Sequence, residues 1–206
     1  MSISNIEINQ IQAITGLGQT PLIGGPAGLL LPFIAQTIPI ITTNQSVQPN
    51  TGVMFLNPIH LAAKQVITNI NFISATTAES SGTHLWFALY DDGRGTTAAN
   101  QLALLGQTAD QTGSAAFAAN TNLGLSLLIP YTTTYSGLHY VAVMCAATTT
   151  PGIRSCSLGV SLPITIGNSA NLLSASAGSG LTAFAPSPSG ALSSVPNNSI
   201  YYAYVS

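Results

Sequence analysis

Hydrophobic and polar residues alternate with a period of two in much of the segment from residue 52 to residue 162. The segment HLWFALY, residues 84–90, is an example. One face of it would carry Leu85, Phe87 and Leu89, and the other face would carry Trp86, Ala88 and Tyr90. This period is typical of β-strands, whose side chains point alternately to the two faces of a sheet. Strands are predicted at residues 64–74, 84–90, 102–108, 115–119, 123–129, 137–146, 154–162 and 199–205.

The arrangement of these segments favours one fold class. Strands that recur roughly every ten residues, with turn-forming residues between them, are typical of antiparallel sandwiches. No segment combines sustained helical spacing with capping residues. We therefore predict an all-β fold, an antiparallel β-sandwich of the jelly-roll type, preceded by an extended N-terminal arm.

The first 52 residues break the alternation. The stretch from Pro21 to Ile41 has the length of a membrane span, but four prolines and three glycines prevent a continuous helix there. Unpaired backbone groups are costly in lipid, so membrane insertion is not expected. We interpret residues 1–52 as an apolar anchoring arm. The residues expected to anchor are Leu22, Ile23, Leu29, Leu30, Leu31, Phe33, Ile34, Ile38 and Ile40.

The sandwich domain is predicted to span residues 53–206. Within it, residues 163–198 are rich in Ser, Gly and Pro and are expected to form long loops over the sheets. The segment SIYYAYV, residues 199–205, alternates again. A flexible tail would not usually end in this way, so the last strand is predicted to return to the sheet.

The composition narrows the function. Only 4% of the residues are charged, against roughly 25% in an average soluble protein. A surface with so few charges loses little ionic hydration when it is buried against a neighbour, which is typical of a subunit in an assembly. The basic residues are Lys64, Arg94 and Arg154. Three basic side chains neutralise few phosphates, so no nucleic-acid partner is expected.

The N-terminus and the two cysteines bear on whether the protein is secreted and whether it forms a disulfide. MSISNIEINQ lacks the positive region and the compact apolar region of a secretory signal peptide. Cys145 and Cys156 lie eleven residues apart. Buried free thiols are the favoured interpretation, because free cysteine is often a core residue. A disulfide between neighbouring strands remains open.

The acidic pair Asp91-Asp92, followed by Gly93, is the most conspicuous candidate for chemistry. Adjacent residues at a strand end point to opposite sides, so they rarely share a proton or a metal ion. Asp and Gly are typical turn residues, and a turn is therefore favoured over a site. The histidines His60, His84 and His139 show no metal-binding spacing. We predict no catalytic residue, no metal ligand and no cofactor, although the many serines leave a Ser–His–acid arrangement open.

Tyrosines near the C-terminus offer a second kind of site. Aromatic rings can stack on sugars, although they more often serve as core or interface anchors. A recognition surface would use Asp91, Asp92, Arg94, Tyr201 and Tyr202.

Several short motifs occur in a fixed order through the second half of the chain. They are KQVITNINF from Lys64, LWFALYD from Leu85, LLGQTA from Leu104, GLHYVAV from Gly137, LTAFAP from Leu181 and the closing YYAY from Tyr201. From Ile59 to Ser206 this order resembles small β-sandwich domains in virion proteins of tailed phages, particularly phages of actinobacteria. Such domains are found in tail fibres, minor tail proteins and head decorations.

The resemblance implies a structural virion protein without enzymatic activity, made in the host cytoplasm and carried on the outer surface of the particle. It implies a homotrimer and contacts with other virion proteins such as the major capsid protein. The short N-terminal region has neither collagen-like repeats nor coiled-coil heptads, which favours a capsid decoration protein over a long fibre. The alternative is a tail-tip or fibre protein that recognises a host glycan.

Overall fold

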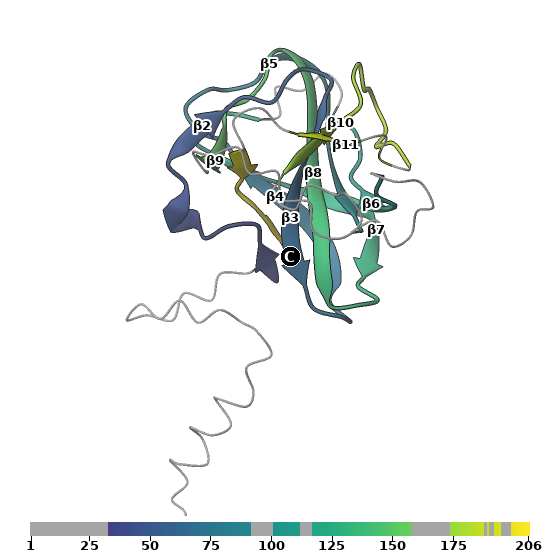
Figure 1. Ribbon diagram of the computed structural model, residues 1–206. Coiled ribbons are helices and arrows are strands. Elements are labelled where there is room, and N and C mark those ends of the chain that lie inside the picture. Colours follow the sequence, from purple (N-terminus) through teal and green to yellow (C-terminus); the bar gives the residue numbers. More distant parts are fainter. Residues whose placement is uncertain are drawn as a thin grey trace, which may run out of the picture. The chain divides into compact units, whose positions relative to one another are not determined.

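The structure is a computed structural model (Figure 1). It divides the chain into two units, Met1–Pro32 and Phe33–Ser206. The described residues all belong to the second unit and are 33–91, 101–111, 117–157, 174–187, 189, 192–194 and 199–206.

The described part of the chain is all-β, as predicted, with one short 3₁₀-helix, η1 (Ile40–Thr42). The strands are β1 (Ala35–Gln36), β2 (Gln45–Val47), β3 (Met54–Leu61), β4 (Val66–Ile73), β5 (Ser80–Tyr90), β6 (Leu104–Gln107), β7 (Asn122–Thr132), β8 (Gly137–Thr149), β9 (Ile153–Ser157), β10 (Ala175–Ala177), β11 (Leu192–Ser194), β12 (Ser199–Tyr201) and β13 (Ala203–Val205).

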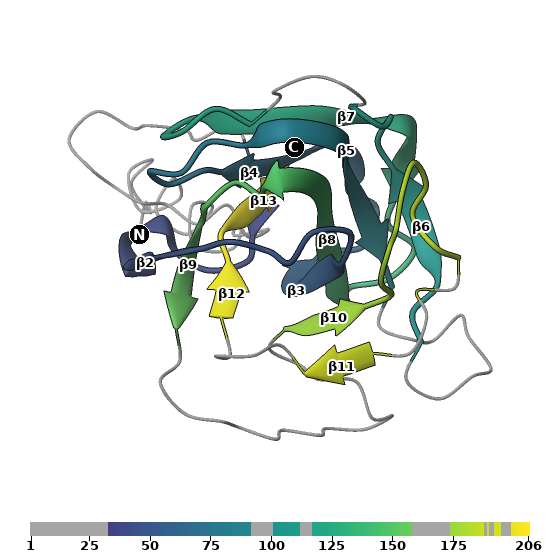
Figure 2. The same ribbon diagram turned by 90° about the horizontal axis from the view of Figure 1, so that it is seen from above.

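These strands form three antiparallel sheets that pack together as a β-sandwich. The four-stranded sheet has the order β1-β13-β4-β7, the six-stranded sheet β11-β10-β3-β8-β5-β6, and the three-stranded sheet β12-β9-β2. Figure 1 shows β3 and β8 side by side, and Figure 2 shows the six-stranded sheet curving from β8 through β3 to β10 and β11. Most strands that are neighbours in a sheet are far apart in the sequence, so long connections cross from one sheet to another.

The inner core lies between the six-stranded sheet and the other two. The odd-numbered positions of β5 and β8, from Leu85 to Leu89 and from Val141 to Cys145, point into it. Phe87 lies at its centre, with its ring centroid 4.8 Å from that of Phe72 and 6.4 Å from that of Phe117. The period of two predicted the two faces of these strands, and the structure shows that the odd-numbered face points inward.

The opposite face of the six-stranded sheet is buried as well. Trp86, Ala88 and Tyr90 of β5 form an outer cluster with Tyr140, Met144 and other even-numbered residues of β8 and β3. Residues 181–187, which we call the strap, run beside β6 over this cluster (Figure 2). Trp86 Nε1 donates to Thr182 O at 2.6 Å and the Tyr90 hydroxyl to Pro186 O at 2.8 Å. The strap is therefore held by the polar tips of otherwise buried aromatic side chains.

Strand β3 was not predicted, and Pro58 explains why. Proline lacks a backbone N–H and is normally excluded from the middle of a sheet. Here β10 pairs only with residues 54–56 of β3, and Pro58 faces Tyr140 of β8 on the other side. Among the described residues, Pro58 thus lies beyond the paired part of β10, and its one strand partner is Tyr140 of β8.

The boundary expected at residue 52 is wrong. β1 pairs with β13 and β2 pairs with β9, so residues 33–52 are part of the sandwich. The Ile34 amide donates to Val205 O at 2.7 Å, and the Phe33 ring lies 5.7 Å from that of Tyr204. The division at Pro32 confines any separate arm to residues 1–32.

Two further expectations at strand level have different outcomes. The last strand does return to the sheet, because β12 pairs with β9 and β13 with β4. The strand expected at residues 115–119 is wrong in its described part, where residues 117–119 lie outside any strand. Both cysteines are free, with Cys145 buried and Cys156 half-buried.

Candidate functional site

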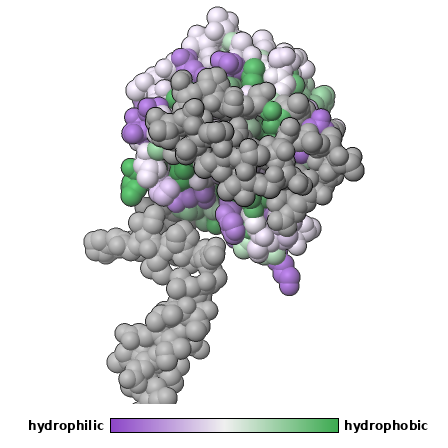
Figure 3. Space-filling model, viewed as in Figure 1, coloured by the Kyte–Doolittle hydropathy of each residue, from purple (hydrophilic) through white to green (hydrophobic). Residues whose placement is uncertain are grey.

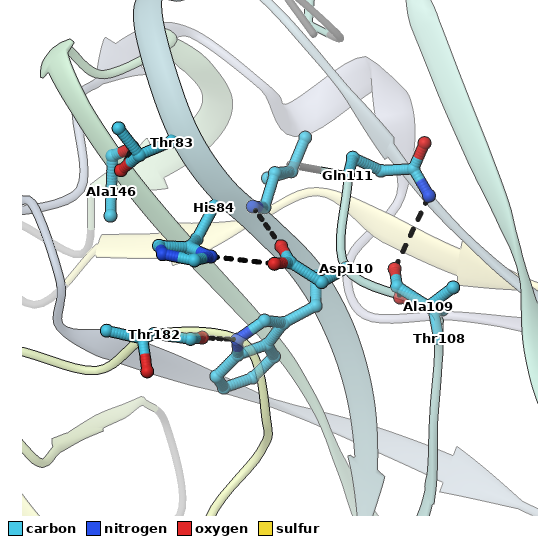
Figure 4. Close-up of polar contacts among 10 residues, drawn as sticks. Thr83, His84, Thr108, Ala109, Asp110, Gln111, Ala146 and Thr182 are labelled. Atoms are coloured by element: carbon cyan, nitrogen blue, oxygen red, sulfur yellow. Dashed lines mark hydrogen bonds and ion pairs between the residues drawn. The ribbon is translucent and has the colours of Figure 1, made fainter. Parts of the chain in front are cut away.

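One His–Asp pair stands out among the polar contacts of the described residues. His84 begins the apolar part of β5, and Asp110 follows β6 on the neighbouring segment. Their Nδ1 and Oδ2 atoms lie 2.6 Å apart, and Oδ1 of Asp110 accepts the Leu85 amide at 3.0 Å (Figure 4). The Gln111 amide also donates to Leu85 O at 2.8 Å. Asp110 therefore extends the pairing of β6 with β5 beyond the end of β6.

Among the described residues, no hydroxyl or thiol contacts the second ring nitrogen of His84. A catalytic triad places a hydroxyl or thiol against the second ring nitrogen of its histidine. The hydroxyl of neighbouring Thr83 instead donates to Ala146 O at 3.0 Å. The described contacts of His84 and Asp110 are those of a structural clamp.

Replacing Asp110 with alanine is expected to lower the free energy of unfolding by about 1–3 kcal/mol, because the Leu85 amide would lose its acceptor. Asp110→Asn keeps an acceptor oxygen and is expected to lose less. Urea unfolding of both variants measures the difference. If Asp110→Ala were as stable as the wild type, the clamp would be wrong.

Glu79 is a buried carboxyl group just before β5. Its Oε2 accepts the Phe117 amide at 3.3 Å, and its Oε1 has no hydrogen-bond partner among the described residues. A Cβ atom at Gly82 would overlap this carboxylate. Burial raises the pKa of Glu79, and the hydrogen bond from Phe117 opposes the rise. Burial, followed by the nearby charge of Glu79, raises the pKa of the Cys145 thiol to about 12, so that this thiol stays protonated and unreactive.

The raised pKa of Glu79 predicts a pH dependence. The folded state holds the proton more tightly than the unfolded chain, so stability falls as pH rises from about 4.5 through the folded-state pKa. Glu79→Gln keeps the acceptor for Phe117 and carries no charge. We expect the variant to match the wild type at low pH and to exceed its stability increasingly as pH rises. Unfolding free energies measured from pH 4 to pH 8 test this, and parallel curves would contradict it.

The residues predicted for surface recognition are mostly placed elsewhere. Asp91, Tyr201 and Tyr202 are 5, 1 and 2% exposed, so a recognition role for these three is wrong. The Asp91 Oδ1 accepts the Ala103 amide at 2.8 Å, and the Asp91 amide donates to Ala103 O at 3.0 Å. These two bonds extend the pairing of β5 with the segment before β6, and the turn predicted at Asp91-Asp92-Gly93 lies largely outside the described residues. Asp92 and Arg94 lie outside the described residues.

The predicted anchoring residues fall into two groups. Leu22, Ile23, Leu29, Leu30 and Leu31 lie outside the described residues. Phe33, Ile34 and Ile38 are half-buried in the sandwich, and Ile40 of η1 is exposed. Phe33 and Ile34 already pack on Tyr204 and the inner core, so they contribute to the sandwich itself, and an additional anchoring role for them stays a prediction.

An apolar groove, which the sequence patterns did not indicate, lies where two sheet edges meet. β6 is the edge of the six-stranded sheet and β7 the edge of the four-stranded sheet. Ile67 and Asn69 of β4 pair with Tyr131 and Ser126 of β7. One residue separates the two on β4, whereas residues 127–130 separate their partners on β7. This bulge carries β7 away from β4, and Leu127 forms an isolated bridge with Thr108 just after β6.

The groove has a volume of about 340 Å³ and is lined by Leu104–Gln107 of β6 and residues 128–131 of β7. None of these residues is charged. Leu128 and Ile129 are 59 and 78% exposed. Large aliphatic side chains side by side at a sheet edge mark an interaction surface or an aggregation hazard. The sequence signal was the proline in LLIPY, because proline in a strand indicates an edge or a bulge.

The rest of the visible surface is weakly polar. On the face drawn in Figure 3, pale side chains of intermediate hydropathy cover most of the coloured area, with small green and purple groups among them. This agrees with the 4% of charged residues in the sequence. Contact with a neighbour would bury few charges over such a surface.

Similarity to known proteins gives no assignment. No protein-family model matches the chain, and no curated protein is a match for it. Within the described ranges, no helix is long and apolar enough to cross a membrane. No three His, Cys, Asp or Glu side chains among those residues come together as metal ligands would. The groove between β6 and β7 is therefore the strongest candidate for a functional surface in the part of the chain that the structure describes.

Proposed function

We propose that this protein is a structural component of a tailed-phage virion, a decoration protein on the outer surface of the head without enzymatic activity. The observation that carries the proposal is the division of the chain at Pro32. A self-contained sandwich begins at Phe33, and the 32 residues before it carry one charge, Glu7. In this proposal the sandwich faces outward and residues 1–32 anchor it to the particle.

The anchoring mechanism is burial of apolar surface. Leucines and isoleucines of residues 1–32 leave water when they bind a partner, which contributes about 25 cal/mol per Å² of apolar surface. The cost of ordering the segment opposes this gain. The low charge of the sandwich supports close packing of copies, and the partners proposed are sister copies in a homotrimer and the major capsid protein.

Gold labelling of intact virus particles with an antibody to the sandwich tests the proposal. Label spread over the head is the expected result. Label confined to the tail end would contradict the head assignment and favour a tail protein that recognises a host glycan. A glycan array would then identify the sugar. Absence of label from every particle would overturn a virion role altogether.

Burial of three predicted recognition residues weakens the alternative function, a tail protein that recognises a host glycan. Asp91, Tyr201 and Tyr202 are buried, so they cannot form the sugar-binding face proposed for them. Phe184 on the strap is 74% exposed and is the one aromatic ring among the large exposed hydrophobic residues of the described chain. A single exposed ring is a weaker basis for glycan recognition than a cluster.

A further inference from the structure

The groove between β6 and β7 needs an occupant that is apolar, uncharged and extended. Its walls are edge strands, and edge strands bind extended segments by adding a strand or by accepting alternate side chains in pockets. Pro130 has no N–H to offer on β7, so side chains must supply much of the binding. The volume of about 340 Å³ lies near the lower end of ligand pockets, roughly 300–1,000 Å³, and suits a few side chains.

We propose that the groove binds the segment Leu29–Leu30–Leu31 of a second copy of this chain. This inference rests on the proposed function, in which residues 1–32 anchor the protein, and it names a sister copy as the partner of that anchor. The segment is the longest run of large aliphatic residues within residues 1–32. Pro26 and Pro32 flank it and favour extended backbone. Neither the segment nor the groove carries a charge, so binding requires no ion to lose its hydration.

Chain length determines which copy is bound. At most about 14 Å of chain joins Leu29 to Phe33, because an extended residue spans at most about 3.6 Å. β1 and β7 are opposite edges of the four-stranded sheet, separated by β13 and β4. At about 4.8 Å per strand, these edges are already about 14 Å apart. The groove opens beyond β7, so the leucines of one copy do not reach their own groove.

The same arrangement determines the type of assembly. Each copy donates leucines that precede Phe33 by two to four residues in the sequence, and accepts a neighbour's leucines beside β7. Donor and acceptor surfaces differ, so the contact is heterologous, and such contacts close into a ring when the rotation between copies allows it. A closed ring of any size fills every groove with one segment, and a ring of three is the one that matches the homotrimer of the proposed function.

Complementation between two full-length variants tests this inference. The groove variant carries Leu128→Asp and Ile129→Asp, and the leucine variant carries Leu29→Asp and Leu31→Asp. Each variant alone is expected to be a monomer, with association at least about 100-fold weaker than in the wild type, because a carboxylate would enter an uncharged groove. An equal mixture is expected to form one-to-one heterodimers, since one variant keeps its leucines and the other keeps its groove. Light scattering coupled to size-exclusion chromatography measures the masses.

Ile41→Asp is the matched control, because Ile41 is 91% exposed and belongs to η1, far along the chain from either groove strand. This variant should assemble like the wild type, and circular dichroism should show that all variants are folded. A monomeric wild type, a mixture without heterodimers, or equal loss of assembly in Ile41→Asp would each overturn the inference. A monomeric wild type that still labels phage heads would leave the proposed function intact. Oligomers that exchange leucines but label no particle would overturn the proposed function alone.

Discussion

Replacing Phe87 with alanine is expected to lower the free energy of unfolding by about 3–5 kcal/mol. Phe87 is fully buried, and its ring contacts Phe72 and Phe117 at the centre of the inner core. Removing the ring loses its transfer free energy and leaves a cavity that β4 and β5 cannot close, since both are fixed in their sheets. Folded domains are stable by only about 5–15 kcal/mol, so the variant should be close to unfolding at 37 °C. Denaturant unfolding measures the loss.

The same substitution at Phe184 is the control. That ring is 74% exposed, so Phe184→Ala should change stability by no more than about 0.5 kcal/mol. Similar losses in the two variants would contradict the position of the inner core. Phe87→Leu, which retains much of the apolar volume, should fall between them.

Shortening the chain to begin at Phe33 is expected to leave the stability of the sandwich unchanged and to abolish attachment to particles. Shortening it further, to begin at Gln48, should cost at least about 3 kcal/mol, since it removes the partly buried Ile34 and Val47 from the inner core. It also removes β1 from β13 and β2 from β9. Unfolding curves and co-sedimentation with particles measure the two effects.

The two chains together separate anchoring from folding. If the chain beginning at Phe33 were less stable than the full-length protein, residues 1–32 would contribute to the fold of the sandwich. If it still decorated particles at the wild-type level, the anchoring role would be wrong. Equal stability of the two shortened chains would contradict the pairing of β1 and β2 with the sheets.

The sequence predicted the part of the fold in which local pattern and tertiary contacts agree. In β5 and β8 the side chains alternate strictly, and both sets are buried, the odd positions in the inner core and the even positions in the outer cluster. The second cluster exists because the strap covers a face that would otherwise be exposed. Alternation identifies the two faces of a strand, but it does not reveal that both are covered.

The pattern of alternating residues did not predict the shortest strands, β1 and β2. β1 has two residues and β2 has three, so neither contains a full period of alternation. They are strands because β13 and β9 offer them unpaired backbone groups, and these partners lie more than 100 residues away. Proline-rich composition therefore suggested an arm where the structure has sheet edges.

The candidate surface was missed for a related reason. Residues 123–129 were predicted as a strand, and Pro130 is the one local sign of an edge or a bulge, but it does not show that Leu128 and Ile129 face solvent. Their exposure results from the bulge opposite Thr68, and that bulge depends on Ser206, whose carbonyl oxygen accepts the Thr68 amide at 2.7 Å. The buried positions of Tyr201 and Tyr202 likewise depend on partners distant in the sequence.

The position of β13 has a consequence for biosynthesis. This strand lies between β1 and β4, so the four-stranded sheet cannot be completed until residue 205 has left the ribosome. About 130 residues separate the end of β4 from the start of β13, which corresponds to roughly 6–26 s of translation at 5–20 residues per second. During that interval Ile70 and Phe72 lack the cover of Ala203 and Val205. Until β13 emerges, this apolar surface of the nascent chain is therefore available to chaperones.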